Sequence, residues 1–551
     1  MNRFTIPVLI LSAILFSPFT AKVLVGQGEY PDHEQLTARL KKISESYPEY
    51  TTLESLVQTE GGKDIWVLSV GAGDLSSTPA IAVVGSTEGD HLLGTELALR
   101  FAEKLLEEYG KPGGKDGLLS DHSFYVFPDV SPDAREQFFA PLKYERKGNA
   151  NSDFTDRFGN KLVHPYNDLN GDGMITFMRI KDPAGEWKTH PADERILVKA
   201  SGLEGEKGEY RLYREGVDFM KEERWYEEGV HFNKNFSFNY PVFTSGAGEH
   251  AVSEKETRAI AGFLFDLKNV YATVSFGPAN NLSQPLKYNE SAASGRIISG
   301  ILEEDAILNQ MVSKKYNEIT DTLLATGSPG SGGDFFQWAY FHYGRHSFST
   351  PGWEVPSGEN EGSPVKQSSG KDIDPKIEFL RWAEKENIDN VFVPWEQASH
   401  PLYPDLEIEV GGIAPYVMNN PPFHMTEQIA EDHYRFIVEL AALKPAVEIF
   451  NFKTEKLGEG LYRISADIAN TGVFPTVAKI GERLKWVQKT VVRLDAGNDQ
   501  EIIGGKAVEV LSAIEGGGSE SRNWLIRGKG ELKLSAGAEN TGYDEIIITL
   551  Q

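Results

Sequence analysis

Short apolar runs alternate with helical patterns over the first 350 residues of the sequence. The apolar runs include residues 79–85 and 270–277, while residues 94–109 place Leu97, Phe101 and Leu105 along one helical face. Strands that alternate with helices are typical of an α/β domain. The pattern therefore predicts a mixed, mostly parallel sheet that is covered by helices.

The same patterns predict further elements before residue 351. A capping box formed by Ser253 and Glu256 is expected to open one of the helices. Residues 135–228 form a long polar section. The predicted strands are 64–71, the start of 122–134, and 346–350, and the predicted helices are 30–48, 252–267 and 298–324.

The pattern changes near residue 444. Short β segments separated by turns follow, and this alternation predicts a small β-sandwich over residues 445–551. A chain of 551 residues is also too long for one ordinary core. We therefore expect an α/β domain over residues 28–444 and the β-sandwich behind it.

The N-terminus resembles a secretory signal peptide over residues 1–27, with Arg3 ahead of an apolar stretch. A membrane anchor is the alternative, but no later apolar run is long enough to span a membrane. The chain has no cysteine, which suits a secreted or periplasmic protein of the bacterial envelope. Its net charge of −26 makes nucleic-acid binding through phosphate contacts an unfavourable hypothesis.

Glu88 and His91 follow the apolar run 79–85, at a predicted strand-to-helix junction. In open α/β sheets, sites form at the carboxyl ends of strands. Carboxylate and imidazole groups are common zinc ligands, so these two residues are candidates for a metal site. The alternative is a polar cluster that is held together by hydrogen bonds and contains no metal.

An ordered series of segments resembles the zinc carboxypeptidases, the carboxypeptidase A-like metallopeptidases. The resemblance spans residues 30–440 and implies that family's fold, with a zinc ion and hydrolysis of a C-terminal residue. The segments are "VVGSTEGDHLLGTELAL", "FPDVSPDARE", "YERKGN", "GVHFNKNF", "SEKETRAI" and "GDFFQWAY", and "NTGVFPT" is similar to the β-domain appended to some bacterial members.

This sequence departs from the family at the positions that carry its chemistry. The first-loop motif H-x-x-E is inverted, with Glu88 and His91 exchanged, and Gly277 stands where a third zinc ligand is expected. Pro351 occupies the place of the catalytic glutamate, so Glu354 is the nearest downstream candidate. His231 replaces an aspartate that supports a zinc ligand, which suggests a Glu88–His231 hydrogen-bonded pair.

A rearranged metal site would need a third ligand beside Glu88 and His91. His231 is the best candidate, and His346 and His342 are weaker ones. The resemblance also implies that Arg146, Asn233 and Lys234 grip a substrate carboxylate. Lysine keeps the positive charge of the family's arginine there, but it lacks the planar guanidinium that can donate two parallel hydrogen bonds to a carboxylate. Ordinary surface ion pairing is the alternative for these three residues.

The stretch "DLNGDGMIT" resembles the front half of a calcium-binding loop. Asp168, Asn170 and Asp172 would supply oxygen ligands at alternate positions, and Gly173 would supply the turn. Arg179 stands at the twelfth position, where a bidentate glutamate is expected. The alternative is an Asp/Asn-rich turn that forms hydrogen bonds with itself.

Two main hypotheses about function follow. The first is a degenerate member of the family that binds peptide or cell-wall peptide C-termini without hydrolysing them. The second is an active metallocarboxypeptidase built on Glu88, His91 and His231. A surface scaffold, in which the β-domain makes the contacts, is a third hypothesis.

Overall fold

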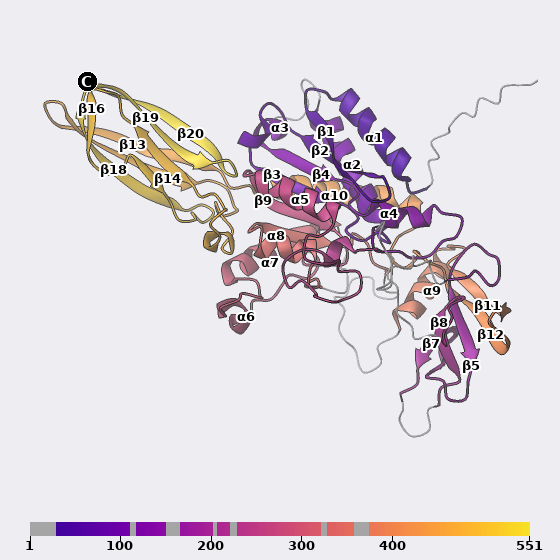
Figure 1. Ribbon diagram of the computed structural model, residues 1–551. Coiled ribbons are helices and arrows are strands. Elements are labelled where there is room, and N and C mark those ends of the chain that lie inside the picture. Colours follow the sequence, from indigo (N-terminus) through magenta and orange to yellow (C-terminus); the bar gives the residue numbers. More distant parts are fainter. Residues whose placement is uncertain are drawn as a thin grey trace, which may run out of the picture.

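The computed structural model describes seven stretches of the chain (Figure 1). They are residues 29–110, 117–149, 166–201, 207–220, 229–320, 328–356 and 374–551. The predicted signal peptide, residues 1–27, lies outside them. Within these stretches no helix has both the length and the apolar character needed to cross a membrane.

A six-stranded sheet forms the centre of the large domain, in the order β1-β2-β4-β3-β9-β10. Strands β4, β3, β9 and β10 run parallel to one another, whereas β2 pairs antiparallel with both β1 and β4. The predicted mixed, mostly parallel sheet is thereby confirmed. The strands are β1 (Thr51–Gln58), β2 (Asp64–Val70), β3 (Ala80–Val84), β4 (Ser123–Phe127), β9 (Val270–Phe276) and β10 (His346–Thr350).

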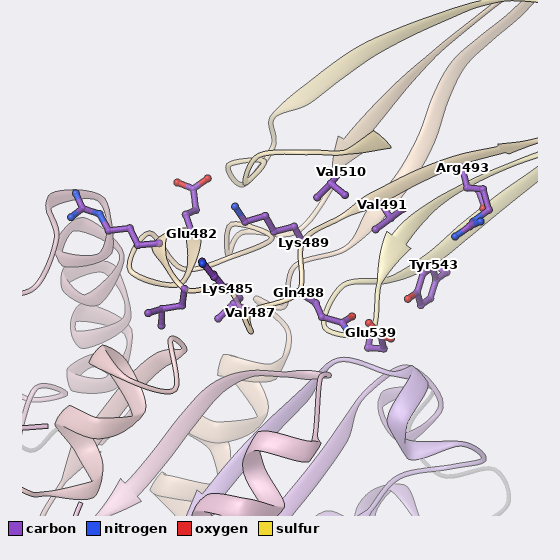
Figure 2. A pocket seen from close by; sticks show the side chains of 13 residues that line it. Glu482, Lys485, Val487, Gln488, Lys489, Val491, Arg493, Val510, Glu539 and Tyr543 are labelled. Carbon is purple, nitrogen blue, oxygen red and sulfur yellow. The ribbon is translucent and has the colours of Figure 1, made fainter. Parts of the chain in front are cut away.

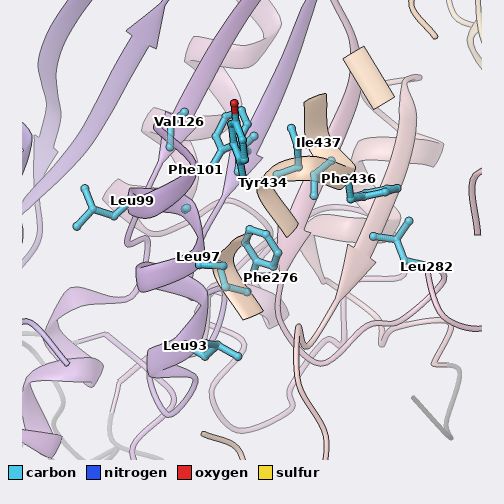
Figure 3. Close-up of a cluster of buried hydrophobic side chains, with 14 of the residues drawn as sticks. Leu93, Leu97, Leu99, Phe101, Val126, Phe276, Leu282, Tyr434, Phe436 and Ile437 are labelled. Atoms are coloured by element: carbon cyan, nitrogen blue, oxygen red, sulfur yellow. The ribbon is translucent and has the colours of Figure 1, made fainter. Parts of the chain in front are cut away.

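Helices cover both faces of this sheet, as alternate residues of β3 illustrate. Ile81 and Val83 join a core with α2 and α10, in which Leu97, Phe101 and Ile437 are buried (Figure 3). The intervening residues of β3 join a second core, with α5 and α8. The helices are α1 (His33–Ser46), α2 (Leu92–Tyr109), α3 (Leu118–Asp121), α4 (Pro132–Arg135), α5 (Lys255–Asp266), α6 (Glu290–Ser294), α7 (Glu303–Thr320), α8 (Phe335–Phe341), α9 (Pro375–Lys385) and α10 (Thr426–Ala441).

Two helix starts differ from the expectation. The predicted capping box is wrong: α5 is preceded by Glu254, which makes no side-chain capping hydrogen bond. The Ser253 hydroxyl instead bonds to Asn235 and Glu254, and the Glu256 carboxylate accepts from Asn149. Helix α7 begins at Glu303 and not near residue 298.

A second sheet takes four of its strands from the section that the sequence marked only as polar, residues 135–228, and its other two from residues 392–413 (Figure 1, lower right). Its order is β11-β12-β5-β8-β6-β7, and its pairings are antiparallel. Its strands bury few residues, so their alternating pattern is weak in the sequence. They are β5 (Phe177–Lys181), β6 (Trp187–His190), β7 (Asp193–Lys199), β8 (Tyr210–Arg214), β11 (Phe392–His400) and β12 (Tyr403–Ile413).

Two four-stranded antiparallel sheets form the C-terminal domain, with a shared apolar core between them. This arrangement confirms the predicted β-sandwich. One sheet has the order β13-β14-β18-β16 and the other β17-β15-β19-β20. The strands are β13 (Val447–Gly458), β14 (Leu461–Asn470), β15 (Val491–Asp495), β16 (Gln500–Gly504), β17 (Val508–Val510), β18 (Ser519–Gly528), β19 (Gly530–Ala538) and β20 (Gly542–Leu550).

Candidate functional site

Loops at the carboxyl ends of β3, β9 and β10 converge on one place. The Thr87 amide donates to the Phe276 carbonyl at 3.2 Å, and the Gly277 amide donates to the Thr350 carbonyl at 3.1 Å. The Asn233 side chain, in the 3-10 helix Phe232–Lys234, donates to the Thr87 hydroxyl at 2.9 Å. The structure therefore brings together the segments in which the sequence placed the candidate residues.

Close backbone packing explains the path of the loop after β3. A Cβ atom on Gly85 would lie 2.2 Å from the Pro128 carbonyl oxygen, so only glycine fits there. Ser86 takes a left-handed φ of 44°, and its hydroxyl donates to the His91 carbonyl at 2.6 Å. The loop is thus tied back on itself, and His91 is buried directly before α2 begins.

The carboxylates of this loop face a lysine. The Lys147 Nζ atom lies 2.6 Å from Glu88 Oε2 and 3.7 Å from Asp90 Oδ2. The Asp90 side chain is only 3% exposed and that of Glu88 14%, whereas that of Lys147 is 45% exposed. The Asn419 amide also donates to Asp90 Oδ2, at 3.2 Å. Lys147 therefore supplies the positive charge beside Glu88.

Burial and charge shift the pKa values of this cluster in opposite directions. Burial raises the pKa of the Asp90 carboxyl to about 7, and the nearby Lys147 ammonium opposes that rise. Burial alone would lower the pKa of Lys147, but the charges of Asp90 and Glu88 outweigh it and raise the pKa above its usual value. Lys147 consequently stays positively charged at neutral pH.

His91 turns its imidazole toward a carbonyl group. Its Nε2 atom lies 2.8 Å from the Pro351 carbonyl oxygen, which can only accept a hydrogen bond. Nε2 must therefore carry the proton, and the lone pair of the neutral imidazole lies on Nδ1, which is buried and has no hydrogen-bond partner among the described residues. Burial also lowers the pKa of His91, so its imidazole is neutral at physiological pH.

The position of the missing third ligand is filled by another side chain. A Cβ atom on Gly277 would lie 1.9 Å from the Thr87 hydroxyl oxygen. The Asn233 amide fixes that threonine, and its own oxygen accepts from the Phe335 amide at 3.3 Å. Both ends of the Asn233 amide thus have a partner inside the protein, and its role in gripping a substrate stays a prediction.

The remaining candidate residues lie around this cluster. Arg146 and Lys234 are half-buried, and they donate to the carbonyls of Gly148 at 3.1 Å and Ser245 at 3.2 Å, respectively. His231 is buried directly before the 3-10 helix, and its backbone amide donates to Gly246. Glu354 is half-buried in the stretch after β10.

The weaker ligand candidates, His346 and His342, lie elsewhere. His346 begins β10 and is 4.0 Å from the Asp305 carboxylate, in contact with the Phe474 ring. Thr350 lies four residue steps further along β10, which is roughly 13 Å. His342 follows α8 and bonds to Ser237. Neither histidine belongs to the cluster around Glu88.

The residues of this site do not fit the zinc ion that the resemblance implies. Lys147 neutralises Glu88, and Gly277 offers no side chain, so His91 with its Nδ1 lone pair is left without a ligand from either of these two positions. Across the part of the chain that the structure describes, no three His, Cys, Asp or Glu side chains are grouped to hold a metal. The predicted trio Glu88, His91 and His231 therefore does not form a metal-binding group.

The predicted calcium loop forms hydrogen bonds with itself. Asp168 accepts from the amides of Gly171 and Gly173 at 2.7 and 2.9 Å. Asn170 accepts from the Asp172 amide, and Asp172 accepts from that of Met174. The geometry thus supports the alternative, an Asp/Asn-rich turn, and gives calcium no support.

Sequence reasoning missed Lys147 and Asp90. Lys147 directly follows Arg146 in "YERKGN", and Asp90 lies between the two predicted ligands. Two carboxylates in one buried loop need a nearby cation when no metal is present, because an unpaired buried charge is costly. That requirement was a usable signal, although it could not say which lysine would meet it.

Family models match two parts of the chain. The model for zinc carboxypeptidases matches residues 36–350, and a domain of unknown function (DUF8731) matches residues 446–549. Because the first match covers more than half of the chain, the protein belongs to the zinc carboxypeptidase family.

Individual proteins match the chain over shorter stretches or at lower sequence identity. Carboxypeptidase M of Mus musculus is 28% identical over 144 residues, which are 24% of this chain and 32% of that protein. Carboxypeptidase E of Caenorhabditis elegans is 31% identical over 146 residues, 24% of this chain and 30% of that protein. The chain thus spans about a third of the length of these relatives. A structure of thrombin activatable fibrinolysis inhibitor has a TM-score of 0.41 and 12% identity, covering 75% of this chain and 74% of that one.

Proposed function

We propose that this protein is an exported, non-catalytic member of the family that binds the C-terminal carboxylate of peptides. The ion pair of Lys147 with Glu88, at 2.6 Å, carries this proposal. An ammonium group supplies positive charge, but it has no open coordination position and cannot activate a water molecule as zinc does. Pro351 in place of the catalytic glutamate removes the expected general base as well.

Arg146 and Lys234 support the binding half of the proposal. Both are half-buried cations beside the converging loops. Charge-assisted hydrogen bonds from such groups to a carboxylate are about twice as strong as neutral ones. Since Asn233 is engaged by Thr87 and Phe335, the grip rests on these two cations.

Peptides that end in a free carboxylate are the ligands that suit these cations. The N-terminal segment favours export, and the absence of cysteine suits the bacterial envelope. Cell-wall peptides carry free carboxylates and are abundant in that compartment. We therefore include them in the proposed ligand class.

Binding of paired peptides tests this function. N-acetylated tripeptides that end in Ala, Phe, Lys or Glu are titrated calorimetrically as free acids and as C-terminal amides. At least one free acid is expected to bind roughly tenfold tighter than its amide, because a lost charge-assisted hydrogen bond costs that much or more. The substitution Lys234→Ala is expected to lower the affinity for the free-acid peptide by a similar factor.

The matched control is Lys314→Ala, which removes one positive charge from an exposed site on α7. It is expected to leave the affinity unchanged. Equal binding of acids and amides would show that the carboxylate is not recognised, and the proposed function would then be wrong.

A further inference from the structure

A cleft on the C-terminal domain gathers positive charge away from the candidate site. Its volume is about 640 Å³, and it lies where the segment after β14 meets the ends of β15, β19 and β20 (Figure 2). None of the candidate residues discussed above lines it. The lining residues are Glu482, Arg483, Leu484, Lys485, Val487, Gln488, Lys489, Val491, Arg493, Val510, Ser535, Glu539 and Tyr543.

Four of the lining residues are cations and two, Glu482 and Glu539, are acids; the charge of Lys489 acts on Glu482. In the same segment Lys479 forms ion pairs with Glu304 and Glu482, which also lines the cleft. By contrast, none of the four forms an ion pair with any residue in the described stretches: Arg483, Lys485, Lys489 and Arg493. The chain has 81 acidic and only 55 basic residues, so a cleft in which four cations outnumber two carboxylates and form no ion pair favours an anionic partner.

The lining of the cleft also includes apolar side chains, which reach an edge of the sheet. Val491 and Val510 line it, and Val510 is 60% exposed. Strand β17, which contains Val510, pairs with β15 and, among the described strands, forms one edge of its sheet. Edge strands offer unpaired backbone groups to an added strand, and exposed valines offer contacts to aliphatic side chains.

These features together favour a polypeptide over other polyanions. A phosphate polymer or an acidic polysaccharide would meet the cations but would leave the exposed valines without an apolar contact. An extended peptide alternates its side chains between two faces, so one face can carry carboxylates and the other aliphatic groups. Tyr543, 59% exposed at the rim, is also a residue type enriched in protein interfaces.

We propose that this cleft binds an extended acidic peptide segment of a partner protein. The carboxylates of that segment pair with Lys489, Arg493 and their neighbours, and its aliphatic side chains contact Val510. The segment adds to the free edge of β17. This binding site is independent of the proposed recognition of peptide C-termini.

Fluorescence anisotropy with two labelled peptides tests the proposal. One probe alternates Glu and Val, and the other replaces every Glu with Gln; both are amidated, so that neither presents a terminal carboxylate. The Glu peptide is expected to bind the full-length protein at least roughly tenfold tighter than the Gln peptide. The double substitution Lys489→Gln, Arg493→Gln is expected to lower the affinity for the Glu peptide by a similar factor.

A second double variant has the same change in charge. Arg463→Gln, Arg527→Gln removes two cations that pair with Glu455 and Glu501 on the other sheet of the domain. Unchanged binding by this variant supports the cleft as the site. Equal binding of both peptides, or equal loss in both double variants, overturns the proposal. If inorganic polyphosphate binds as tightly as the Glu peptide, the cleft is a general polyanion site and the assignment to a peptide is wrong.

Discussion

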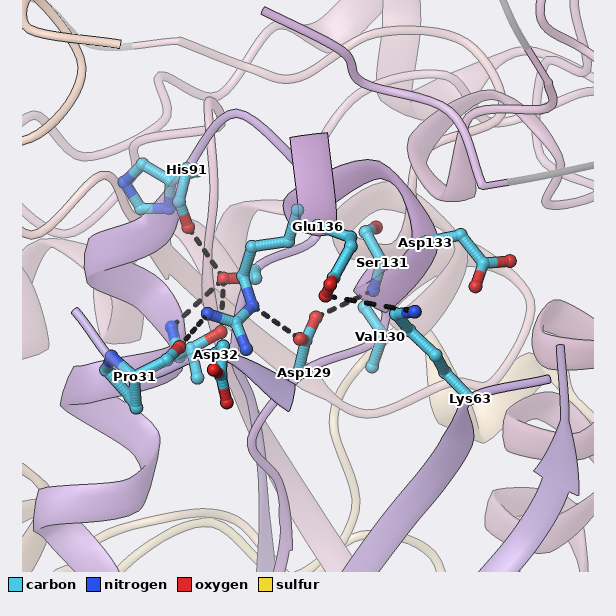
Figure 4. A network of polar contacts seen from close by, with 12 residues as sticks. Pro31, Asp32, Lys63, His91, Asp129, Val130, Ser131, Asp133 and Glu136 are labelled. Atoms are coloured by element: carbon cyan, nitrogen blue, oxygen red, sulfur yellow. Dashed lines mark hydrogen bonds and ion pairs between the residues drawn. The ribbon is translucent and has the colours of Figure 1, made fainter. Parts of the chain in front are cut away.

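Replacing Arg135 with methionine is expected to lower the free energy of unfolding by about 3–5 kcal/mol, because it leaves Asp129 as an uncompensated buried charge. The two side chains are 1% and 2% exposed, and Arg135 Nε donates to Asp129 Oδ2 at 2.6 Å. The guanidinium also donates to the Pro31 carbonyl, and Asp129 accepts from the Ser131 amide at 3.1 Å (Figure 4).

The same pair supports the candidate site. The Asp133 amide, two residues before Arg135, donates to Asn149, and the Asn149 side chain donates to the Val130 carbonyl. Asn149 lies two residues after Lys147. Loss of the buried ion pair is therefore expected to loosen the segment that places Lys147 beside Glu88.

A double-mutant cycle measured by chemical denaturation checks this expectation. Asp129→Leu alone should lower the free energy of unfolding by as much as Arg135→Met does. The double variant should lower it by clearly less than the sum of the two single effects, since no unpaired charge remains. Arg463→Met, at an exposed ion pair on the C-terminal domain, should change stability by less than about 0.5 kcal/mol. A cost below about 1 kcal/mol for Arg135→Met would contradict the importance of the pair.

The substitution Phe474→Ala is expected to have the second large effect and to lower the free energy of unfolding by about 3–5 kcal/mol. Phe474 belongs to the C-terminal segment "NTGVFPT", yet its fully buried ring lies in the core of the large domain. Its ring centre is 4.9 Å from that of His346, 5.5 Å from Tyr271 and 6.2 Å from Phe348. An alanine would leave a cavity between the two domains, and we expect them to unfold in one transition in the native protein.

Differential scanning calorimetry on the full chain measures this effect. Val473→Ala is the neighbouring control, because that side chain is 44% exposed and its truncation should change little. Two separate transitions in the native protein, or equal effects of the two substitutions, would show that Phe474 does not join the domains.

The sequence predicted the fold where burial is complete. Strands such as β3 and β9 are buried at every residue, so their apolar runs are unmistakable. The second sheet was missed because strands such as β6 have no fully buried residue, and a strand half-exposed on both faces shows no clear alternation. The predicted capping box does not form because both of its side chains bond to residues of other segments.

The candidate site was predicted at the level of segments and missed at the level of contacts. Strand order and loop position bring Glu88, His91 and Asn233 to one edge of the sheet, as the motif order implied. No pattern in one sequence states that Lys147 reaches Glu88, because 59 residues separate them. The position of Thr87 against Gly277 likewise depends on packing between two loops.

The bound-metal content of the purified protein tests the central claim most directly. The mature protein is prepared without chelator, equilibrated with excess zinc, desalted and measured by mass spectrometry beside a Glu88→Ala, His91→Ala double variant. The account predicts only trace zinc, equal in both proteins, because Lys147 supplies the charge beside Glu88. About one zinc per chain, lost in the double variant, would contradict it and establish a rearranged metal site.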